Sequence, residues 1–398
     1  MPSIRLLSSE TEQEIELILK RLAVDPYGIR IMAPKAASLL VEVTGISALC
    51  ANILKQEMLS CGADCAIPRN ALAAQVKKTA CVLMGNRAQY QRLIMKLKVQ
   101  PFGLAEIGRQ IRLLLDNTRK IKFVLKAKDT SLTLGARTRI MGIVNVTPDS
   151  FSGDGLSHKS TEAVADYALQ LAREGADVLD IGGESSRPGA IPVPLREELA
   201  RTIPVIRLLS KKTKVAISID TYKPEVAARA LDNGASIVND ISGLRAPAMA
   251  RLVARSKAAV VIMHMKGRPR IMQKAPVYGC LMQEIIAYLS GAVDTALQAG
   301  IEPERIMVDP GIGFGKTMEH NLEILKRLPE LKTIGRPVMV GTSRKSFIGK
   351  ILDAPAGSRL MGSVASTVLA AANGAHMVRV HDVFAVAQAL KVADKILA

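Results

Sequence analysis

The sequence predicts an α/β protein whose larger part is an eight-stranded parallel (β/α)8 barrel, or TIM barrel, preceded by a small α+β domain. Three observations support this: strands alternate with helices from residue 139 onward, glycines end several helices just before a strand, and the apolar residues are mostly aliphatic. Of 398 residues 48% are hydrophobic but only 3% aromatic, with no Trp. Aliphatic residues are typical of buried parallel strands and the helices that cover them.

The alternation consists of eight apolar runs, each followed by a connection that is helical in most cases. Glycines 175, 234 and 374 each follow a helical pattern and precede a strand. Eight units in about 260 residues match a barrel, whereas an open doubly wound sheet usually has fewer strands and a glycine-rich phosphate motif. The expected strands are Ile140–Val146, Ala176–Ile181, Lys214–Ile219, Ser236–Asn239, Ala259–Met263, Arg305–Val308, Pro337–Gly341 and Ala375–Val380. Expected helices include Ser160–Glu174, Lys223–Asn233, Met282–Ala299 and Arg359–Asn373.

The residues before the barrel have a different character. We expect a small basic α+β domain of unknown role at 1–125, a linker at 126–137 and the barrel at 138–398. The first domain shows no chemical motif. Its expected strands are Ser38–Thr44 and Thr79–Met84, and its expected helices are Ala48–Ser60, Arg87–Lys98 and Ala105–Leu115.

Positive charge is concentrated in one stretch of the chain. The formal net charge is +18, and residues 69–128 hold 14 Lys and Arg against two acidic residues. This charge allows a nucleic-acid- or protein-binding role for the first domain. Solvated basic helix faces are common, however, and twelve aromatic residues in the whole chain offer little for base stacking. We therefore favour a structural addition packed on the barrel, and consider nucleic acid an improbable partner.

Cysteine use and the N-terminus indicate the compartment. The five cysteines contain no C-x-x-C pair, so free buried thiols are expected rather than disulfides or a zinc site. The first 20 residues contain four glutamates and no apolar signal region. No apolar run approaches the 18 or so residues that cross a membrane. We expect a cytoplasmic protein without a membrane partner.

Polar side chains follow all eight expected strands. In a (β/α)8 barrel these positions form the functional face. Any one of them could simply cap a helix or shape a turn, but eight at equivalent positions indicate a site. They are Asn145, Asp180 with Glu184, Asp220, Asn239, Met263 with His264, Asp309, Ser343–Ser346, and Arg379 with His381.

The chemistry of these groups suggests their ligands. Asp220, Asn239, Asp309 and Lys345 suit a flat heterocycle with an N–H edge, because buried carboxylates need donors. Asn145, Arg379 and His381 come from the first and last strands, which are neighbours in a closed barrel, and they suit phosphate oxygens. Residues 342–346 open a helix whose free N–H groups suit a carboxylate. By contrast, residues 311–317 lack the spacing of a phosphate-binding P-loop.

With these segments in order, the chain from about residue 138 to 398 resembles the dihydropteroate synthase family. The matching segments are Gly142–Phe151, Asp180–Ala190, Ser218–Pro224, Val238–Gly243, Met263–Lys266, Asp309–Lys316, Gly341–Gly349 and Arg379–Val383. The resemblance implies condensation of 6-hydroxymethyl-7,8-dihydropterin diphosphate with 4-aminobenzoate, giving 7,8-dihydropteroate and pyrophosphate in folate biosynthesis. It also implies Mg²⁺, a homodimer and inhibition by sulfonamides, which mimic the aminobenzoate.

The resemblance further implies roles for individual residues. The catalytic set is Lys345, Asp220, Arg379 and His381. The pterin set is Asp220, Asn239, Met263, Asp309 and Lys345. The diphosphate set is Asn145, which also holds the metal, with Arg379 and His381. The aminobenzoate set is Phe151, Ser186, Arg187, Pro188, Phe314 and Ser346.

The sequence departs from the family pattern at two positions. Ser186 stands where Thr is common, and Asp154 stands one place later than usual. Asp154, which we expect to help close the first loop over substrate, therefore departs from the family position, whereas Asn145 does not. A rival is the pterin-binding barrel of the methyltetrahydrofolate:corrinoid methyltransferase type, which shares the Asp and Asn pocket. That type has no need of the Ser-Arg-Lys-Ser segment or of Arg379 and His381, so the synthase is favoured.

Overall fold

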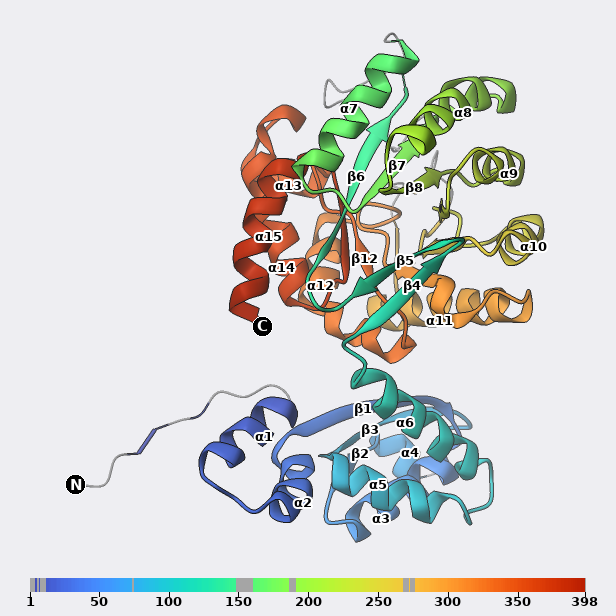
Figure 1. Ribbon diagram of the computed structural model, residues 1–398. Helices are drawn as coiled ribbons and strands as arrows, with labels where there is room; N and C mark the ends of the chain where they lie inside the picture. The colour runs from blue at the N-terminus through green and yellow to red at the C-terminus, as the bar shows by residue number, and fades with distance from the viewer. Residues whose placement is uncertain are drawn as a thin grey trace. The chain divides into compact units, whose positions relative to one another are not determined.

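The chain forms two compact units, Met1–Arg119 and Lys120–Ala398. The computed structural model describes residues 4–5, 7, 12–73, 75–147, 160–185, 191–267, 272 and 276–397 (Figure 1). The boundary between the units corrects the expected division, because the first unit ends at 119 rather than 125. Residues 126–137, expected as a linker, lie inside the second unit, and residues 126–127 and 130–134 belong to strands.

The first unit is an α+β domain built on a three-stranded antiparallel sheet in the order β1-β3-β2. All five elements expected there are present, while β2, α1, α2 and α4 are additional. The strands are β1 (Ser38–Ile46), β2 (Asp64–Ala66) and β3 (Thr79–Asn86). The helices are α1 (Glu12–Arg21), α2 (Pro26–Ala36), α3 (Ala48–Ser60), α4 (Arg69–Leu72), α5 (Arg87–Leu97) and α6 (Leu104–Thr118).

Local side-chain contacts explain where these elements begin. Ser47 caps α3 by accepting the N–H of Cys50 at 3.1 Å. Asn86 and Gln89 form a reciprocal capping box at the start of α5. Tyr90 on α5 is fully buried, and its hydroxyl lies 3.0 and 2.9 Å from the carbonyl oxygens of Leu39 and Leu83. It thereby ties α5 to both long strands of the sheet.

The second unit is the expected barrel. Its parallel strands run in the order β11-β10-β9-β8-β7-β6-β13-β12, and a parallel bridge between Val308 and Val338 closes the ring. The fold class and all eight expected strands are therefore confirmed. The strands are β6 (Arg139–Asn145), β7 (Val178–Gly182), β8 (Ala216–Asp220), β9 (Ile237–Asp240), β10 (Ala259–Met263), β11 (Ile306–Asp309), β12 (Met339–Val340) and β13 (Met377–Val380).

Helices surround this ring, as Figure 1 shows. Their apolar faces and the outward side of every strand share one core. They are α7 (Thr161–Glu174), α8 (Leu195–Lys212), α9 (Pro224–Asp232), α10 (Pro247–Ser256), α11 (Leu281–Gln298), α12 (Met318–Lys326), α13 (Ser346–Leu352), α14 (Leu360–Ala372) and α15 (Val383–Leu397). Short 3-10 turns lie at Pro303–Arg305, Leu328–Ile334 and Ala356–Ser358.

The inside of the barrel changes from apolar to polar along each strand. Because side chains alternate between faces, every second residue points inward. On β13 the inward residues are Met377 and then Arg379, and on β11 they are Met307 and then Asp309. The period-two pattern thus places an apolar layer at the amino-terminal end of the strands and polar groups at the other end.

A β-hairpin packs against the apolar layer. Its strands β4 (Phe123–Ala127) and β5 (Thr130–Leu134) pair in an antiparallel fashion. Leu125 and Leu134 are buried in one cluster with inward residues of all eight barrel strands. Gly135 has φ +91°, and a Cβ there would lie 1.7 Å from the Ile121 carbonyl oxygen, so only glycine fits. The hairpin therefore forms the floor of the barrel.

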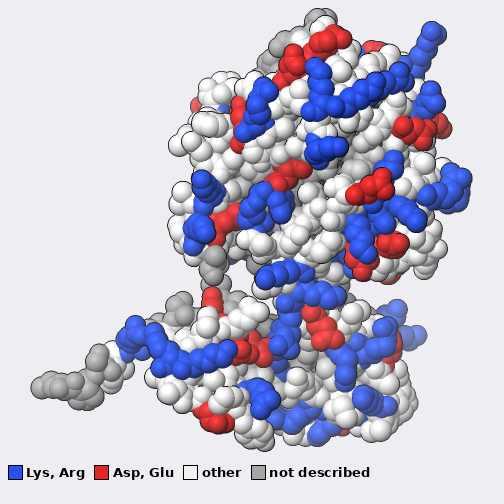
Figure 2. Space-filling view, viewed as in Figure 1, with Lys and Arg blue, Asp and Glu red and all other residues white. Residues whose placement is uncertain are grey.

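Three other sequence expectations can be compared with the described residues. Cys50, Cys61, Cys65 and Cys81 are buried free thiols as expected, whereas Cys280 is a free thiol at the surface. No helix in the described ranges is long and apolar enough to cross a membrane; the cytoplasmic location stays a prediction. Figure 2 shows Lys and Arg spread over the visible face of each unit with acidic residues among them.

The floor generates a stability prediction. Leu134→Ala removes a fully buried side chain from the hairpin cluster, so we expect the free energy of unfolding to fall by about 2–5 kcal/mol. Val124→Ala changes an exposed residue of the same hairpin and should cost less than about 0.5 kcal/mol. Urea denaturation of both variants measures the difference. Equal losses would contradict the role of the hairpin as a packed floor.

Candidate active site

A cavity of about 580 Å³ lies at the carboxyl ends of the barrel strands. This volume is within the usual range for small-molecule sites. The cavity brings together every expected site residue that the structure describes. These are Asn145, Asp220, Asn239, Met263, Asp309, Phe314, Lys345, Ser346, Arg379 and His381.

Arg379 joins two buried carboxylates at the bottom of the cavity. Its Nε donates to Asp180 Oδ2 and its Nη2 to Asp220 Oδ2, each at 2.6 Å. These residues stand on β13, β7 and β8, and Asp180 is fully buried. The opposite charges compensate for burial, since an unpaired buried charge costs several kcal/mol. Burial alone lowers the pKa of Arg379, but the two aspartates raise it overall, so the guanidinium stays charged.

The remaining polar groups of this layer are held in place by hydrogen bonds. Asn239 on β9 donates its side-chain amide to Asp180 Oδ2 at 3.1 Å. Asp309 at the end of β11 accepts the backbone N–H of Gly311 at 2.6 Å, and burial raises the pKa of Asp309. Asn145 ends β6, whose neighbours in the ring are β7 and β13. The expected convergence of Asn145, Arg379 and His381 is therefore confirmed.

The loop after β12 carries the cationic wall of the cavity. Lys345 Nζ lies 4.3 Å from the ring centre of Phe314, a cation–π contact. Arg344 has φ +56°, an uncommon left-handed conformation, and its guanidinium pairs with both oxygens of Asp382 at 3.0 and 2.6 Å. His381 Nδ1 lies 3.0 Å from Ser343 Oγ. Backbone strain supported by ion pairing in this way is typical of functional loops.

The glycines of residues 311–317, which resemble a phosphate-binding loop, are needed for close packing between two loops. Gly311 and Gly315 have positive φ, and a Cβ at either would lie 2.0 or 2.4 Å from a carbonyl oxygen of the β10 loop. They allow the two loops to pack closely. Lys316 is buried behind them, with Nζ 2.9 Å from His264 Nδ1 and 3.0 Å from the Phe314 carbonyl oxygen. Burial lowers its pKa to about 7.

Four expected site residues lie outside the described ranges, and the structure adds site residues that the sequence did not predict. Phe151, Ser186, Arg187 and Pro188, together with Asp154 of the closure hypothesis, lie outside the described residues. Asp180 and Glu184 follow the second expected strand, but the sequence predicted no role for either. Their position after a buried run was the available signal. Lys316 gave no signal, because its burial depends on how two loops pack.

A family model described as pterin binding enzyme matches residues 141–381, which include β6 to β13 and the whole polar layer. The chain belongs to the pterin-binding enzymes, as a dihydropteroate synthase.

Two similar proteins come from bacteria. The dihydropteroate synthase of Synechocystis is 49% identical over 272 residues, which cover 68% of this chain and 94% of that protein. A crystal structure of the Xanthomonas albilineans dihydropteroate synthase with 4-aminobenzoic acid is 46% identical, with a TM-score of 0.65. The match covers 70% of this chain and 99% of the Xanthomonas chain. These matches favour the synthase over the methyltransferase alternative.

A relative from Halobacterium salinarum extends the likeness beyond the barrel of this synthase. It carries the description of a probable bifunctional folylpolyglutamate synthase/dihydropteroate synthase. It is 40% identical over 377 residues, or 94% of this chain, and the match spans 45% of that longer protein. The matched length exceeds that of the second unit, so the likeness includes most of the first unit.

Asp220 is a buried carboxylate of the polar layer whose pKa is raised toward neutral pH. Burial and the charges of Asp180 and Glu198 raise its pKa to about 7, although Arg379 and Lys345 act in the opposite direction. Its value in the unfolded chain is near 3.8. Between about pH 4 and pH 7 the folded enzyme therefore holds a proton that the unfolded chain has lost, and Asp220 makes folding less favourable as pH rises. Above that window the carboxylate is ionised and can accept N–H groups of a ligand.

This titration generates a pH prediction. We expect the affinity of the wild-type enzyme for a pterin to increase with pH and to level off above about pH 7. Asp180→Asn removes a neighbouring negative charge, which should lower the pKa of Asp220 and shift the midpoint down by about one pH unit. Calorimetric dissociation constants across pH 5–9 measure it. Asp177→Asn, at the other end of the barrel, is the control, and an unchanged midpoint in Asp180→Asn would contradict the prediction.

Proposed function

We propose that this cavity joins 6-hydroxymethyl-7,8-dihydropterin diphosphate to 4-aminobenzoate, giving 7,8-dihydropteroate and pyrophosphate for folate biosynthesis. One observation supports this above all: the Arg379 guanidinium, held between Asp180 and Asp220, lies in one cavity with an amide, a further carboxylate and a lysine. These three groups belong to Asn239, Asp309 and Lys345. That combination matches a heterocycle with an N–H edge that carries an anionic leaving group. Sulfonamides, as mimics of the aminobenzoate, are the expected inhibitors.

The pterin occupies the polar layer in this proposal. Asp220 and Asp309 accept N–H groups of the ring, and Asn239 can both donate and accept. Lys345 supplies a donor to the carbonyl and imine acceptors of the ring. Met263 offers an apolar surface at the end of β10, next to Asp309 in the register of the two strands. The aminobenzoate then lies on the side of Phe314 and Ser346.

The diphosphate leaves toward Arg379 and His381. A guanidinium has five N–H donors, and its bonds to Asp180 and Asp220 use Nε and Nη2, so others are available to phosphate oxygens. The bond between the pterin methylene carbon and the diphosphate oxygen breaks, and its electron pair departs with the diphosphate. The resulting methylene cation is tolerated by the nearby carboxylates. The amine of 4-aminobenzoate donates its lone pair to that carbon and then loses a proton.

The weak aniline nucleophile needs positioning more than activation. No covalent enzyme intermediate is required, so the catalytic residues Lys345, Asp220, Arg379 and His381 act by binding and by stabilising charge.

Magnesium is the proposed metal. Within the described ranges no three His, Cys, Asp or Glu side chains converge to hold an ion by themselves. Mg²⁺ commonly uses one or two protein oxygens, with substrate phosphates and water as the remaining ligands. Asn145 lines the cavity and offers an oxygen of that kind. The residues present therefore fit Mg²⁺ that is bound together with the diphosphate, where it would stabilise negative charge on the leaving group.

A homodimer is the proposed assembly. Helix α14 contains no charged residue, and Met361 and Leu369 on its outer side are 76% and 60% exposed. Phe384 and Val392 on α15, which packs beside α14, are also exposed. Apolar residues of this kind on adjacent helices are typical of subunit interfaces. A second copy is the proposed occupant because the family resemblance implies a dimer.

The activity generates a direct prediction. The enzyme should release pyrophosphate on mixing the two substrates with Mg²⁺, measured with a coupled phosphate assay. Arg379→Met removes the cation that stabilises the leaving group and should lower kcat/KM by about 10²–10³-fold. Arg137→Met removes a half-exposed arginine that pairs with Asp177 at the floor end, so it should have little effect on kcat/KM. No pyrophosphate release by the wild type would contradict the proposed reaction.

The assembly generates a further prediction. Met361→Glu together with Leu369→Glu places charges on the exposed side of α14, so we expect the dimer to dissociate. Sedimentation velocity should show a halved mass. Leu113→Glu alters an exposed residue of the first unit and serves as the control. An unchanged mass in the α14 double variant would show that this surface is not the interface.

A further inference from the structure

The pairing of β12 with β13 continues beyond the ends of both strands. Within the strands, paired residues are 38 positions apart. Two side-chain contacts in the loops that follow have the same separation. Ser343 Oγ lies 3.0 Å from His381 Nδ1, and the Arg344 guanidinium binds the Asp382 carboxylate. Side chains thus extend the register of the barrel by two pairs of residues toward the cavity.

Arg344 has a backbone conformation that is unfavourable for any residue with a Cβ. The N–H of Lys345 donates to the Thr342 carbonyl oxygen at 3.2 Å, which closes a four-residue turn with Arg344 as its third residue. Arg344 has φ +56°, and a turn with positive φ at this position usually has glycine there. An arginine in this place therefore needs contacts that offset the cost of its backbone conformation.

Three side chains supply such contacts, and each binds a different part of Arg344. Asp382 accepts the guanidinium at 3.0 and 2.6 Å, and Ser363 Oγ accepts the backbone N–H at 2.9 Å. Arg359 Nη1 donates to the backbone carbonyl oxygen of Arg344 at 3.2 Å. Ser363 is fully buried, and the paired side chains of Arg344 and Asp382 are each 20% exposed. The loop after β13 and the start of α14 together hold this one residue.

The place of Lys345 depends on this arrangement. Lys345 directly follows Arg344 and precedes α13, so the conformation of Arg344 sets the direction in which the lysine side chain leaves the backbone. A Cβ on Gly313 would lie 3.2 Å from Lys345 Cδ, and Lys345 Nζ lies 4.3 Å from the ring centre of Phe314. Burial raises the pKa of Asp309, and Lys345 is among the charges that oppose this effect. The ammonium therefore acts on the polar layer across the cavity.

The residues that hold Arg344 do not all reach the ligand space. Of the described residues, Arg344 and Lys345 line the cavity, whereas Asp382 and Ser363 do not. We propose that Asp382 and Ser363 are positioning residues that fix Lys345 in the cavity by holding Arg344 in its left-handed conformation. The inference rests on the proposed function in one respect, namely that the ligand of Lys345 is a pterin ring.

The test is a double-mutant cycle on pterin binding. Asp382→Asn keeps the size of the side chain and removes its charge, so the dissociation constant of 6-hydroxymethylpterin, measured by calorimetry, should rise about tenfold. In a Lys345→Met background the same substitution should raise the constant less than about twofold, because no ammonium is left to misplace. Asp177→Asn removes a carboxylate that pairs with two arginines at the floor end, and it should leave the constant unchanged in both backgrounds.

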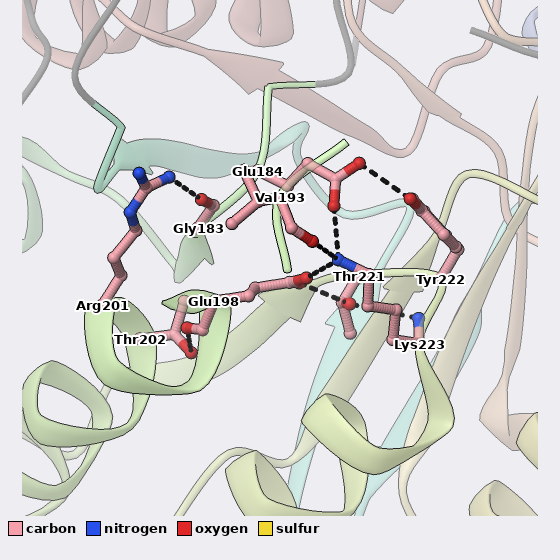
Figure 3. A network of polar contacts seen from close by, with 9 residues as sticks. All are labelled: Gly183, Glu184, Val193, Glu198, Arg201, Thr202, Thr221, Tyr222 and Lys223. Atoms are coloured by element: carbon pink, nitrogen blue, oxygen red, sulfur yellow. Dashed lines mark hydrogen bonds and ion pairs between the residues drawn. The ribbon is translucent and has the colours of Figure 1, made fainter. Parts of the chain in front are cut away.

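A second polar network at the same end of the barrel provides a local control (Figure 3). Lys223 donates to Glu184 and Glu198 at 2.5 Å each, and Arg201 donates to a backbone carbonyl oxygen in the same network at 2.8 Å. None of the residues drawn in that view belongs to the loops after β12 and β13. Arg201→Met should therefore change the dissociation constant by the same factor in the wild-type and Lys345→Met backgrounds.

Ser363→Ala covers the case in which Asp382→Asn does not fold. It removes the acceptor that binds the Arg344 N–H and keeps the helix, so the dissociation constant should rise about threefold, again only when Lys345 is present. The proposal is overturned if the folded variants keep the wild-type constant, if their effects persist in Lys345→Met, or if Arg201→Met shows equal coupling. A wild-type protein that does not bind the pterin would instead contradict the proposed function, so the two failures are distinguishable.

Discussion

The ion pairs of Arg379 with Asp180 and Asp220 are the interaction on which the rest of the site depends. Two carboxylates within one barrel layer repel each other, and a single guanidinium between β7 and β8 compensates for both. The compensation is incomplete, because the pKa of Asp220 stays raised. Asn239 on β9 donates to the same Asp180 oxygen. The guanidinium of Arg379 on β13 is therefore linked directly to β7 and β8, and through Asp180 to β9. These hydrogen bonds hold the polar layer in place without a ligand, so the site is preorganised.

The barrel strands show how a simple pattern produces this layer. Alternation along the strand sends every second residue inward, and the chain places methionine or aliphatic residues first and polar residues second. The apolar layer packs on the β4–β5 hairpin and gives the polar layer a rigid base. Function is therefore confined to one end of each strand, whereas stability comes from the other end and from the outer helices. Loops complete the site with close contacts that only glycine allows, as at Gly311.

Much of this organisation was predictable from the sequence, because strand ends are visible as polar residues after aliphatic runs. Asn145, Asp309 and Arg379 were found in this way, and their convergence follows from barrel closure. The floor hairpin was not, since residues 126–137 are short and mixed in polarity and their burial depends on the barrel above them. The pairing of Lys223 was not predicted for another reason: its ammonium bonds Glu184 and Glu198, which are 39 and 25 positions away. Pairing between loops leaves no periodic signal in a sequence.

The hairpin at the amino-terminal end of the barrel has a kinetic consequence. Because that end is packed, ligands reach and leave the polar layer through the opening at the opposite end of the barrel. A molecule seated against Asp180 and Arg379 must enter before anything that fills the mouth above it. It must also leave after that second molecule, unless the reaction has joined the two molecules covalently. A floor made of two short strands thus imposes an order of arrival on a reaction that takes place at the far end of the barrel.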